Sequence, residues 1–511
     1  MSETQDRVEV GRQGTIETVS VSSAGADRLK PGAIGLFGVI FVAVTGAAPI
    51  SAMLFNVPFS TGFGTGYYTP AAFLFAAVVL TIFSIGYVAM AREIKAAGGF
   101  YSFISHGLGR VLGLATGICG VVAYALFEIS LLGGFAYFFS TNFNSWFGWE
   151  IPWILPAVGA AALIAILCWF DVELSVKVLG VALISEIVIL AIFDILVFGQ
   201  GGASSGIAWD SVNVAKLTDP GVGLAAGVGL FLAFWSWVGF EAIPNYAEES
   251  KDPKRNVVRA TMIAVIGLGV MYVITSMAFV SSYPKDTLIQ DAQNPDGPFF
   301  VSMENFGTDW LATLMQVLIL TGAFACAMAF HNVAMRYFYA MGREGILPKA
   351  LGRTHGTHKV PHIANITAMI IAIVLMVVWG ISSGFGFDKA FDTAYVRVYT
   401  MMAVQGVVWI LAIQALCALA VIVWFRSGGR RGNPITTLIC PIIAIVGQVF
   451  AIYLLFANID TLAGTISYVD WIAPIAVAVV VISIVYALVL RSTNRKKFDT
   501  IGRMIDDTGN L

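Results

Sequence analysis

Four carboxyl side chains lie inside long apolar runs of the sequence: Glu128, Glu186, Asp194 and Glu241. A charged side chain at the centre of a bilayer costs roughly 2.5–3.5 kcal/mol on insertion scales. Charged residues are therefore found inside membrane spans mainly where the group faces a cavity, a proton path or a polar partner. These acids therefore predict a site that holds a cation or an amine, or that passes protons.

The composition is typical of a chain that folds in a lipid bilayer. Hydrophobic residues make up 58% of its 511 residues and charged residues only 12%, whereas soluble domains carry about 25% charged residues. The net charge of −2 is too small to suggest a nucleic-acid partner. The five cysteines fall in or beside apolar segments, which favours buried packing residues over an external disulfide framework.

Apolar runs long enough to cross about 30 Å of hydrocarbon predict an all-α membrane protein of about twelve transmembrane helices. The runs are 33–57, 70–91, 111–141, 153–170, 174–199, 222–244, 257–281, 309–335, 363–384, 399–425, 434–457 and 467–490. They form one transmembrane domain at 33–491, between an N-terminal tail (1–32) and a C-terminal tail (492–511). The N-terminal tail lacks an apolar signal core, so we expect no cleaved signal peptide.

Basic residues are distributed unequally between the two sides of this arrangement. Of the 29 Lys and Arg residues, all lie on the side that holds both termini except Lys216, Lys285, Lys389 and Arg397. The positive-inside rule places the basic side, and with it both termini, in the cytoplasm. We therefore expect an integral protein of the cytoplasmic membrane.

Two of the predicted spans carry helix-weakening centres. The first contains Thr45-Gly46-Ala47-Ala48-Pro49, and the sixth contains Phe234-Trp235-Ser236-Trp237-Val238-Gly239-Phe240-Glu241. Proline removes a backbone donor, and glycine lowers helix stability by about 1 kcal/mol relative to alanine. Interrupted helices at corresponding positions indicate a binding site at the centre of an inverted five-helix repeat. Ordinary kinked packing helices are the alternative.

Three motifs follow one another on the predicted cytoplasmic side. They are Ala97-Gly98-Gly99-Phe100-Tyr101 with Gly107-Leu108-Gly109-Arg110, Gly239-Phe240-Glu241 with the run from Glu248 to Asn256, and the run from Arg336 to Pro348. In order and spacing they resemble the signatures of the amino acid–polyamine–organocation (APC) permeases, over essentially the whole chain. The resemblance implies that spans one to five and six to ten form the inverted repeat, with two peripheral helices. It also implies secondary uptake or exchange of amino acids or amines.

The resemblance assigns substrate contacts to both breaks. The implied contacts are Thr45, Gly46, Ala47, Ala48, Phe234, Trp235, Ser236, Gly239 and Glu241. Trp235 occupies a position where relatives place an aromatic gate, and an aromatic ring over an ammonium gains roughly 0.5–2 kcal/mol. Many relatives carry Gly-Ser/Thr-Gly in the first break, and the departure here leaves an amine or amino alcohol open beside an α-amino acid. Glu128 could reach the cavity from the third span and hold a second amine.

Glu186 and Glu241 are the predicted proton-coupling acids. The resemblance places Glu186 where several proton-coupled relatives carry a lysine, and Glu241 where relatives often carry an acid. Sodium needs several oxygen ligands together, and the stretch 323–328 of the eighth span has no hydroxyl. We expect a proton rather than sodium as the coupled ion. Local pairing that only stabilises the structure is the alternative for both acids.

The remaining polar residues carry weaker signals. His355, His358 and His362 have a spacing that suggests zinc, but no acid or cysteine completes a ligand set, so no metal is expected. His331 lies within a span, where a neutral histidine with a backbone partner is the expected state. Asp194 lies close to the helix face of Glu186, nearer the periplasmic end.

The function expected from these residues is secondary active transport, by proton-coupled uptake, of amino acids or related small amines. An amine exchanger is the alternative, and a membrane sensor without transport is a further one, although both tails are short for an appended soluble domain. No nucleophile or metal constellation indicates an enzyme, and no cofactor is expected. The charged cytoplasmic loop 248–259 is expected to serve gating or helix docking.

Overall fold

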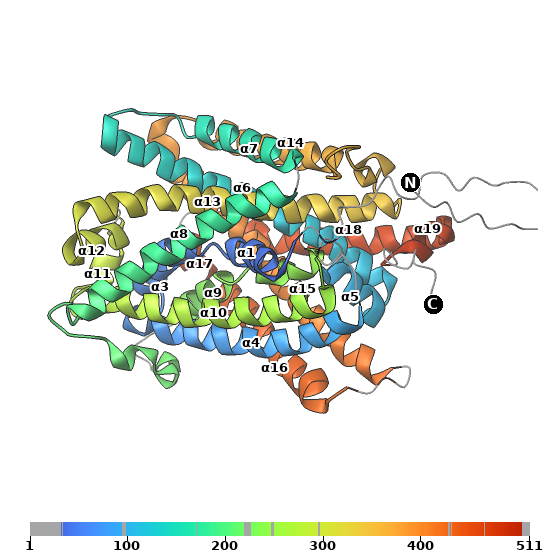
Figure 1. The fold of residues 1–511 in the computed structure, drawn as a ribbon, viewed down its shortest axis with the longest axis horizontal. Helices are drawn as coiled ribbons and strands as arrows, with labels where there is room; N and C mark the ends of the chain where they lie inside the picture. The colour runs from blue at the N-terminus through green and yellow to red at the C-terminus, as the bar shows by residue number, and fades with distance from the viewer. Residues whose placement is uncertain are drawn as a thin grey trace, which may run out of the picture.

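The computed structural model describes residues 32, 34–94, 99–170, 172–218, 226–246, 250–294, 297–427, 430, 432–463 and 466–502. Over these ranges the regular elements are helices, together with one isolated β-bridge between Ile34 and Ser250. Long helices lie side by side along the long axis of the molecule (Figure 1). Except for Gly32, the predicted N-terminal tail falls outside the described residues, as do residues 503–511 of the predicted C-terminal tail.

The elements of the first half are α-helices (α) and short 3-10 or π-helical segments (η). They are α1 (Leu36–Gly46), α2 (Pro49–Ser51), η1 (Ala52–Asn56), α3 (Val57–Phe63), η2 (Gly66–Tyr68), α4 (Thr69–Glu93), α5 (Gly99–Leu108), α6 (Arg110–Phe147), α7 (Ile154–Trp169), α8 (Val172–Gly199), η3 (Trp209–Val212), η4 (Val214–Thr218), α9 (Ala226–Trp235) and η5 (Phe240–Tyr246).

The second half continues in the same way. Its elements are α10 (Pro253–Ser281), α11 (Leu288–Ala292), α12 (Pro298–Phe306), α13 (Asp309–Arg343), η6 (Lys349–Gly352), α14 (His362–Ser383), η7 (Phe387–Lys389), η8 (Ala390–Met401), α15 (Met402–Arg426), η9 (Ile435–Ile439), α16 (Cys440–Ala457), α17 (Ile459–Ala463), α18 (Val469–Thr493) and α19 (Arg495–Thr500).

Eleven helical segments of the described chain are long and apolar enough to cross a membrane, which confirms an all-α membrane protein. The prediction of about twelve spans differs at 153–170, which is the 16-residue helix α7. At 1.5 Å per residue this helix is about 24 Å long, short of the roughly 30 Å hydrocarbon core. The structure therefore gives eleven long spans and one shorter apolar helix.

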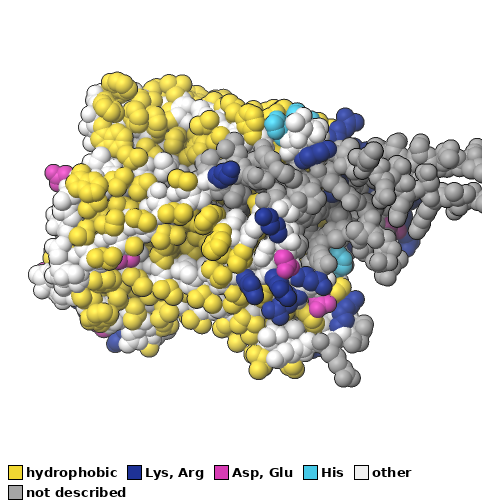
Figure 2. Space-filling view, viewed as in Figure 1, with side chains coloured by type: hydrophobic (Ala, Val, Ile, Leu, Met, Phe, Trp, Pro, Cys, Tyr) yellow, Lys and Arg dark blue, Asp and Glu magenta, His cyan; other side chains and the backbone are white. Residues whose placement is uncertain are grey.

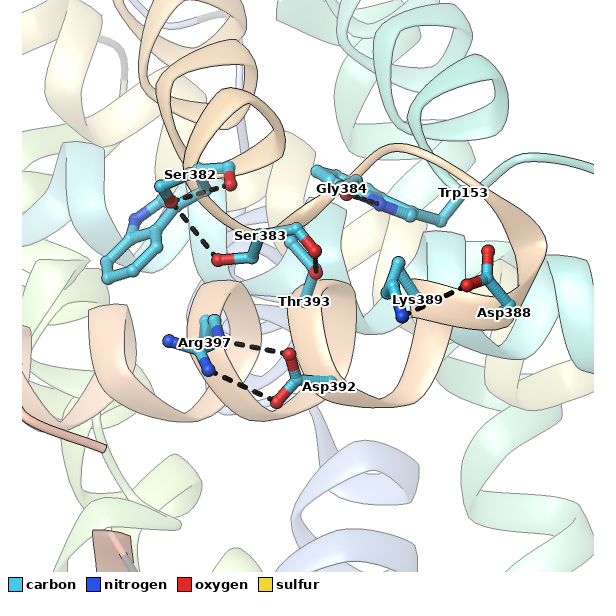
Figure 3. Close-up of polar contacts among 10 residues, drawn as sticks. Trp153, Ser382, Ser383, Gly384, Asp388, Lys389, Asp392, Thr393 and Arg397 are labelled. Atoms are coloured by element: carbon cyan, nitrogen blue, oxygen red, sulfur yellow. Dashed lines mark hydrogen bonds and ion pairs between the residues drawn. The ribbon is translucent and has the colours of Figure 1, made fainter. Parts of the chain in front are cut away.

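The predicted span 399–425 begins earlier than its hydropathy indicated. The helical segment runs from Phe387 to Arg426, through η7 and the π-helical η8 into α15. Asp392 and Arg397, which the sequence placed outside this span, lie within η8 as an ion pair, with 3.2 Å between Oδ2 and Nε (Figure 3). The helical segment therefore runs through this ion pair.

Basic side chains gather at one end of the bundle. On the face shown in Figure 2, Lys and Arg side chains cluster at the end that carries α5 and α19 in Figure 1, while hydrophobic side chains cover much of the remainder. We call this the basic end; α11 and α12 lie at the opposite end. By contrast with the outer helices, α9 and η5 are buried along their whole length, which places the sixth predicted span at the centre of the protein.

Candidate functional site

The first predicted span is interrupted at its centre. Helix α1 ends at Gly46, and the chain turns through Ala47 and Ala48 before α2 resumes at Pro49. Ala48 has φ 44°, a left-handed conformation that is uncommon for a residue with a side chain. Pro49 has no amide hydrogen to lose at the start of a helix, so it begins the new segment readily.

The sixth predicted span is interrupted as well. Helix α9 ends at Trp235, residues 236–239 form turns, and the chain continues as the 3-10 segment η5. Gly239 ends the turn with φ 122°, a backbone conformation that favours glycine. Both interruptions therefore fall where glycine and proline weaken the predicted helices.

The two breaks touch each other through their backbones. A Cβ atom built on Gly239 would lie 2.4 Å from the carbonyl carbon of Gly46, and one built on Gly46 would lie 3.4 Å from the Cα of Gly239. From α10, the Tyr272 hydroxyl lies 3.0 Å from the Ala47 carbonyl oxygen and 3.1 Å from that of Ser236. The single hydroxyl hydrogen of Tyr272 is thus within hydrogen-bonding distance of one carbonyl oxygen from each break. Nothing in the apolar sequence around Tyr272 marks it for this role.

A small cavity lies beside this contact. Its volume is about 30 Å³, room for about two water molecules. It is lined by Gly46, Ala47, Ala48, Ser51, Ala52, Asn56, Phe127, Leu131, Trp235, Ser236, Val238, Cys326, Phe330 and Tyr399. Of the predicted substrate contacts, Gly46, Ala47, Ala48, Trp235 and Ser236 line the cavity, whereas Thr45, Phe234, Gly239, Glu241 and Glu128 do not.

Aromatic rings close the cavity on two sides. Trp235 and Tyr399 lie with their ring centroids 5.9 Å apart, and Phe55 stands 4.5 Å from Tyr399. Phe127 of α6 and Phe330 of α13 stack at 4.9 Å. Of these, the sequence pointed only to Trp235; Phe127, Phe330 and Tyr399 lie on spans with no local feature that marks an inward face.

Ser51 is the polar group of the cavity that is left without a partner. Its side chain is buried, and its Oγ has no hydrogen-bond partner among the described residues. By contrast, the neighbouring Asn56 amide donates to the Ser236 Oγ at 2.8 Å, and the Cys326 thiol lies 3.4 Å from the Gly46 carbonyl oxygen. A buried hydroxyl without a partner is unfavourable, which makes Ser51 a candidate contact for a polar group bound beside the breaks.

The comparison with known proteins decides the family. Residues 34–495 match the profile of the amino acid permease family. The chain belongs to the amino acid permease family. Its members are transporters rather than enzymes, so the chain is an integral membrane permease for amino acids or amines.

The permease resembles relatives with different stated substrates. It is 22% identical over 375 residues to the branched-chain amino acid permease BcaP of Bacillus subtilis, covering 70% of this chain and 76% of the relative. It is 27% identical over 363 residues to the vacuolar cationic amino acid transporter 4 of Arabidopsis thaliana, covering 67% and 56%. It is 23% identical over 351 residues to the low-affinity putrescine importer PlaP of Escherichia coli, covering 66% and 72%.

Glu241 folds back onto the second break of the permease. Its Oε2 accepts a hydrogen bond from the Gly239 amide at 2.9 Å, and its Oε1 accepts one from the Tyr124 hydroxyl of α6 at 3.1 Å. The Glu241 carbonyl oxygen accepts from the Tyr87 hydroxyl of α4 at 2.8 Å. Glu241 therefore joins η5 to α6 and to α4, and it satisfies an amide that the break sets free.

Glu186 holds the first break from α8. Its Oε2 accepts a hydrogen bond from the Ile50 amide at 3.2 Å, directly after the break. Its Oε1 is buried without a hydrogen-bond partner among the described residues and lies next to α13, where a Cβ built on Gly322 would be 3.0 Å away. Thr45 also bonds to α8, through the Leu179 carbonyl at 3.3 Å. Glu186 thus contacts a broken helix from a neighbouring helix, whereas Glu241 lies within the other broken helix.

The other intramembrane polar residues lie away from the cavity. Glu128 contacts His331 at 2.8 Å, and Asp194 accepts from the Thr275 hydroxyl of α10 at 2.9 Å. The rings of His355, His358 and His362 gather beside Trp169 and Phe170 at the end of α7. Over the described part of the chain, no three His, Cys, Asp or Glu side chains converge as metal ligands would.

The charged loop 248–259 is described from Ser250 onward. Asp252 caps α10, because its carboxylate accepts from the Arg255 amide at 3.3 Å, and the Arg255 guanidinium lies 3.9 Å from the same carboxylate. The contacts of these two residues thus lie within the first turn of α10 itself, and a role of the loop in gating or helix docking stays a prediction. Glu248 and Glu249 fall outside the described residues, as do Ala97 and Gly98 of the first motif.

The contact of the two breaks gives a first prediction. Gly239→Ala should destabilise the permease by at least about 2 kcal/mol, because a side chain there is strained in its backbone conformation and overlaps the Gly46 carbonyl. Gly46→Ala is the matched control, since its Cβ would sit at the limit of ordinary contact. Thermal unfolding of both purified variants in detergent measures the difference. Equal stability of the two variants would show that the backbones are not in contact.

Proposed function

We propose that this permease is a proton-coupled secondary transporter that takes up amino acids or related small amines across the cytoplasmic membrane. The observation that carries the proposal is the cavity between the two interrupted helices, which is lined by residues of both breaks and by Ser51, whose buried hydroxyl has no partner among the described residues. Interrupted transmembrane helices offer free amides to a carboxylate and free carbonyls to an ammonium. The relatives named for amino acids and for putrescine support this substrate range.

The cavity lining favours a small apolar amino acid within that range. Its lining residues include no carboxylate, lysine or arginine, whereas Phe127, Leu131, Val238 and Phe330 are apolar. A zwitterion can satisfy both of its charges on the backbone of the breaks and place its side chain against these residues. A diamine would place a second ammonium group against apolar residues with no carboxylate to pair with it. Burying an unpaired charge in this way costs free energy.

The substrate contacts that we propose are the backbone at Gly46, Ala47 and Ala48, the Ser51 hydroxyl and the Trp235 ring. Trp235 and Tyr399 lie between this cavity and a second, smaller one of about 10 Å³. An ammonium under the indole would gain cation–π energy. Because the cavity holds only about 30 Å³, a substrate must enlarge it, which requires the aromatic walls to separate.

The transport cycle that we propose is a rocking of the broken helices against the remaining ones. Spans one to five and six to ten would form inverted repeats, with the site where the repeats meet. The basic end, where Lys and Arg gather in Figure 2, would face the cytoplasm, as would both termini.

Coupling to a proton would use Glu186 and Glu241. Each joins a broken helix to a helix outside it: Glu186 joins α8 to the start of α2, and Glu241 joins η5 to α6. Gain or loss of a proton changes what these carboxyl groups can accept and donate. A proton would therefore alter the very contacts that must change when the broken helices move. Sodium has no further side-chain oxygen in 323–328 of α13 to complete a ligand set.

Substrate competition in reconstituted vesicles tests the substrate class. With labelled leucine as the reporter, unlabelled alanine, valine and leucine should compete, and putrescine should compete at least about tenfold less well, because the cavity wall holds no acid for a second ammonium. If putrescine or arginine competes best, the apolar-substrate proposal is wrong. If no amine-bearing solute competes or accumulates, the transport proposal itself is wrong.

Glu186→Gln tests the coupling proposal. The variant should lose accumulation against a gradient but retain counterflow exchange of substrate, since the amide keeps the shape of the side chain and cannot release a proton. Asp194→Asn is the matched control on the same helix, because Asp194 bonds to Thr275 away from both breaks; it should keep accumulation. Both variants are measured in vesicles with an imposed inward proton gradient.

The ion is identified in the same vesicles at fixed pH. Replacing sodium with choline should leave uptake by the wild-type permease unchanged, while collapse of the proton gradient should abolish accumulation. Uptake that requires sodium and ignores the proton gradient would make Glu186 a sodium ligand or a structural residue. Accumulation that needs neither gradient but follows a preloaded amine would identify an exchanger.

A further inference from the structure

A chain of buried hydrogen bonds crosses four helices behind the cavity. Glu128 of α6 lies 2.8 Å from Nδ1 of His331 on α13, and Nε2 of the same ring lies 2.7 Å from Oδ1 of Asn365 on α14. The Asn365 amide nitrogen donates to the carbonyl oxygen of Ala165 on α7 at 2.9 Å. The three side chains are buried, with His331 and Asn365 at 0% and Glu128 at 1% exposure.

The direction of each hydrogen bond in this chain can be assigned from its far end. The Ala165 carbonyl can only accept, so the amide nitrogen of Asn365 must face it and Oδ1 must face His331. Oδ1 can also only accept, so Nε2 of His331 carries a hydrogen. Nδ1 and the Glu128 carboxyl group then share one further proton, whether it sits on nitrogen or on oxygen.

Among the described residues, Glu128 and His331 form no hydrogen bond or ion pair with any further charged side chain. Helices α7 and α14 carry no lysine, arginine, aspartate or glutamate. On α6, Tyr124 donates to Glu241 instead. On α13, the Arg336 guanidinium lies 4.1 Å over the Tyr246 ring and the Cys326 thiol contacts Gly46. The pair is therefore a net-neutral unit that holds its shared proton within the protein.

The neighbours of the pair in the chain form one wall of the cavity. Phe127 precedes Glu128 and Phe330 precedes His331, and these two rings stack at 4.9 Å with an interplanar angle of 18°. Both rings line the cavity, whereas Glu128 and His331 do not. A hydrogen bond between α6 and α13 at this level thus fixes the rotation of both helices, and with it the position of the stacked rings.

The same helices are tied together at the end opposite the basic end. The Asn142 amide and the Trp146 indole of α6 donate to Gln316 of α13 at 3.1 and 3.0 Å. The Trp153 indole, just before α7, donates to the Gly384 carbonyl at the end of α14 at 3.0 Å (Figure 3). The four helices are therefore joined by hydrogen bonds at two levels. One level is at this end of the bundle, and the other is the Glu128–His331–Asn365 chain.

We propose that Glu128 and His331 are positioning residues that retain one proton throughout transport and hold Phe127 and Phe330 against the substrate. Glu128 then neither binds the substrate amine nor carries the coupled proton. The inference deepens the proposed function, on which it rests, because it takes the cavity as the substrate site. In this account Glu128 and His331, which the substrate does not touch, hold the apolar wall of the cavity in place. The preference for a substrate with an apolar side chain then depends on this polar pair.

Glu128→Gln is the decisive variant. Its amide can donate to Nδ1 of a neutral His331 whose Nε2–H still bonds to Asn365, so the hydrogen-bond chain survives without an ionisable acid. KM for the transported amino acid should stay within about twofold of the wild type, and the pH profile of uptake should be superimposable on it. Loss of uptake, or a shifted pH profile, would overturn the proposal and make Glu128 a substrate-binding or coupling acid.

Glu128→Leu and His331→Leu test the positioning itself, because each leaves a buried polar partner unsatisfied. Each should raise KM for leucine by about tenfold or more while lowering the melting temperature by about 5 °C or more. Wild-type KM and stability in both leucine variants would overturn the proposal.

The experiment also separates this inference from the proposed function. Failure of the wild-type permease to move any amine would contradict the proposed function. The pair is then tested by thermal unfolding alone, in which Glu128→Gln should match the wild type between pH 5 and 8 and Glu128→Leu should not. Equal melting temperatures for Glu128→Gln and Glu128→Leu would overturn the inference, whatever the substrate.

Discussion

The backbones of the two interrupted helices touch at Gly46 and Gly239, in a membrane interior that offers no water to the peptide groups set free by each break. Those groups are met by side chains instead, and each comes from a defined place in the fold. The side chains are Glu186 of α8, Glu241 of η5, Tyr272 of α10 and Cys326 of α13. The need to satisfy the breaks therefore fixes how the surrounding helices are placed around the cavity.

The contacts divide the helices into two groups. Tyr272 joins both breaks to α10, and Tyr87 joins η5 to α4, so in the proposed cycle these helices would form the moving group. The Glu128–His331–Asn365 chain joins α6, α7, α13 and α14. The bonds of Glu186 and Glu241, like that of the Cys326 thiol, run from the first group to helices outside it. The proposed rocking of one group against the other would change these bonds, which is why we propose that the acids that make them couple transport to a proton.

The sequence predicted the spans and the breaks well because their causes are local. A bilayer demands about 20 apolar residues per helix, and proline and glycine weaken a helix where they stand. The exceptions have physical reasons: α7 is too short to meet the length criterion, and the Asp392–Arg397 pair hides the start of its helix from hydropathy.

The partners of the site could not be predicted, because they depend on helix rotation and long-range pairing. Both faces of a membrane helix are apolar, so no periodicity marks which face of α6 or α13 meets the cavity. Glu128 looked free to hold an amine, but its partner His331 lies 203 residues away in the chain. Tyr272 stands in an apolar run without any motif, and only packing brings it to the breaks.

The central claim is that substrate binds in the cavity between the two breaks, and Cys326, which lines that cavity, reports on it directly. The measurement is the rate at which a small methanethiosulfonate reagent modifies Cys326 in the reconstituted permease, with Cys326→Ala as the background. Saturating leucine, or whichever amino acid competes best in uptake, should slow this modification several-fold, while a solute that does not compete should leave it unchanged. A rate that the transported substrate does not alter would place the substrate elsewhere and contradict the account.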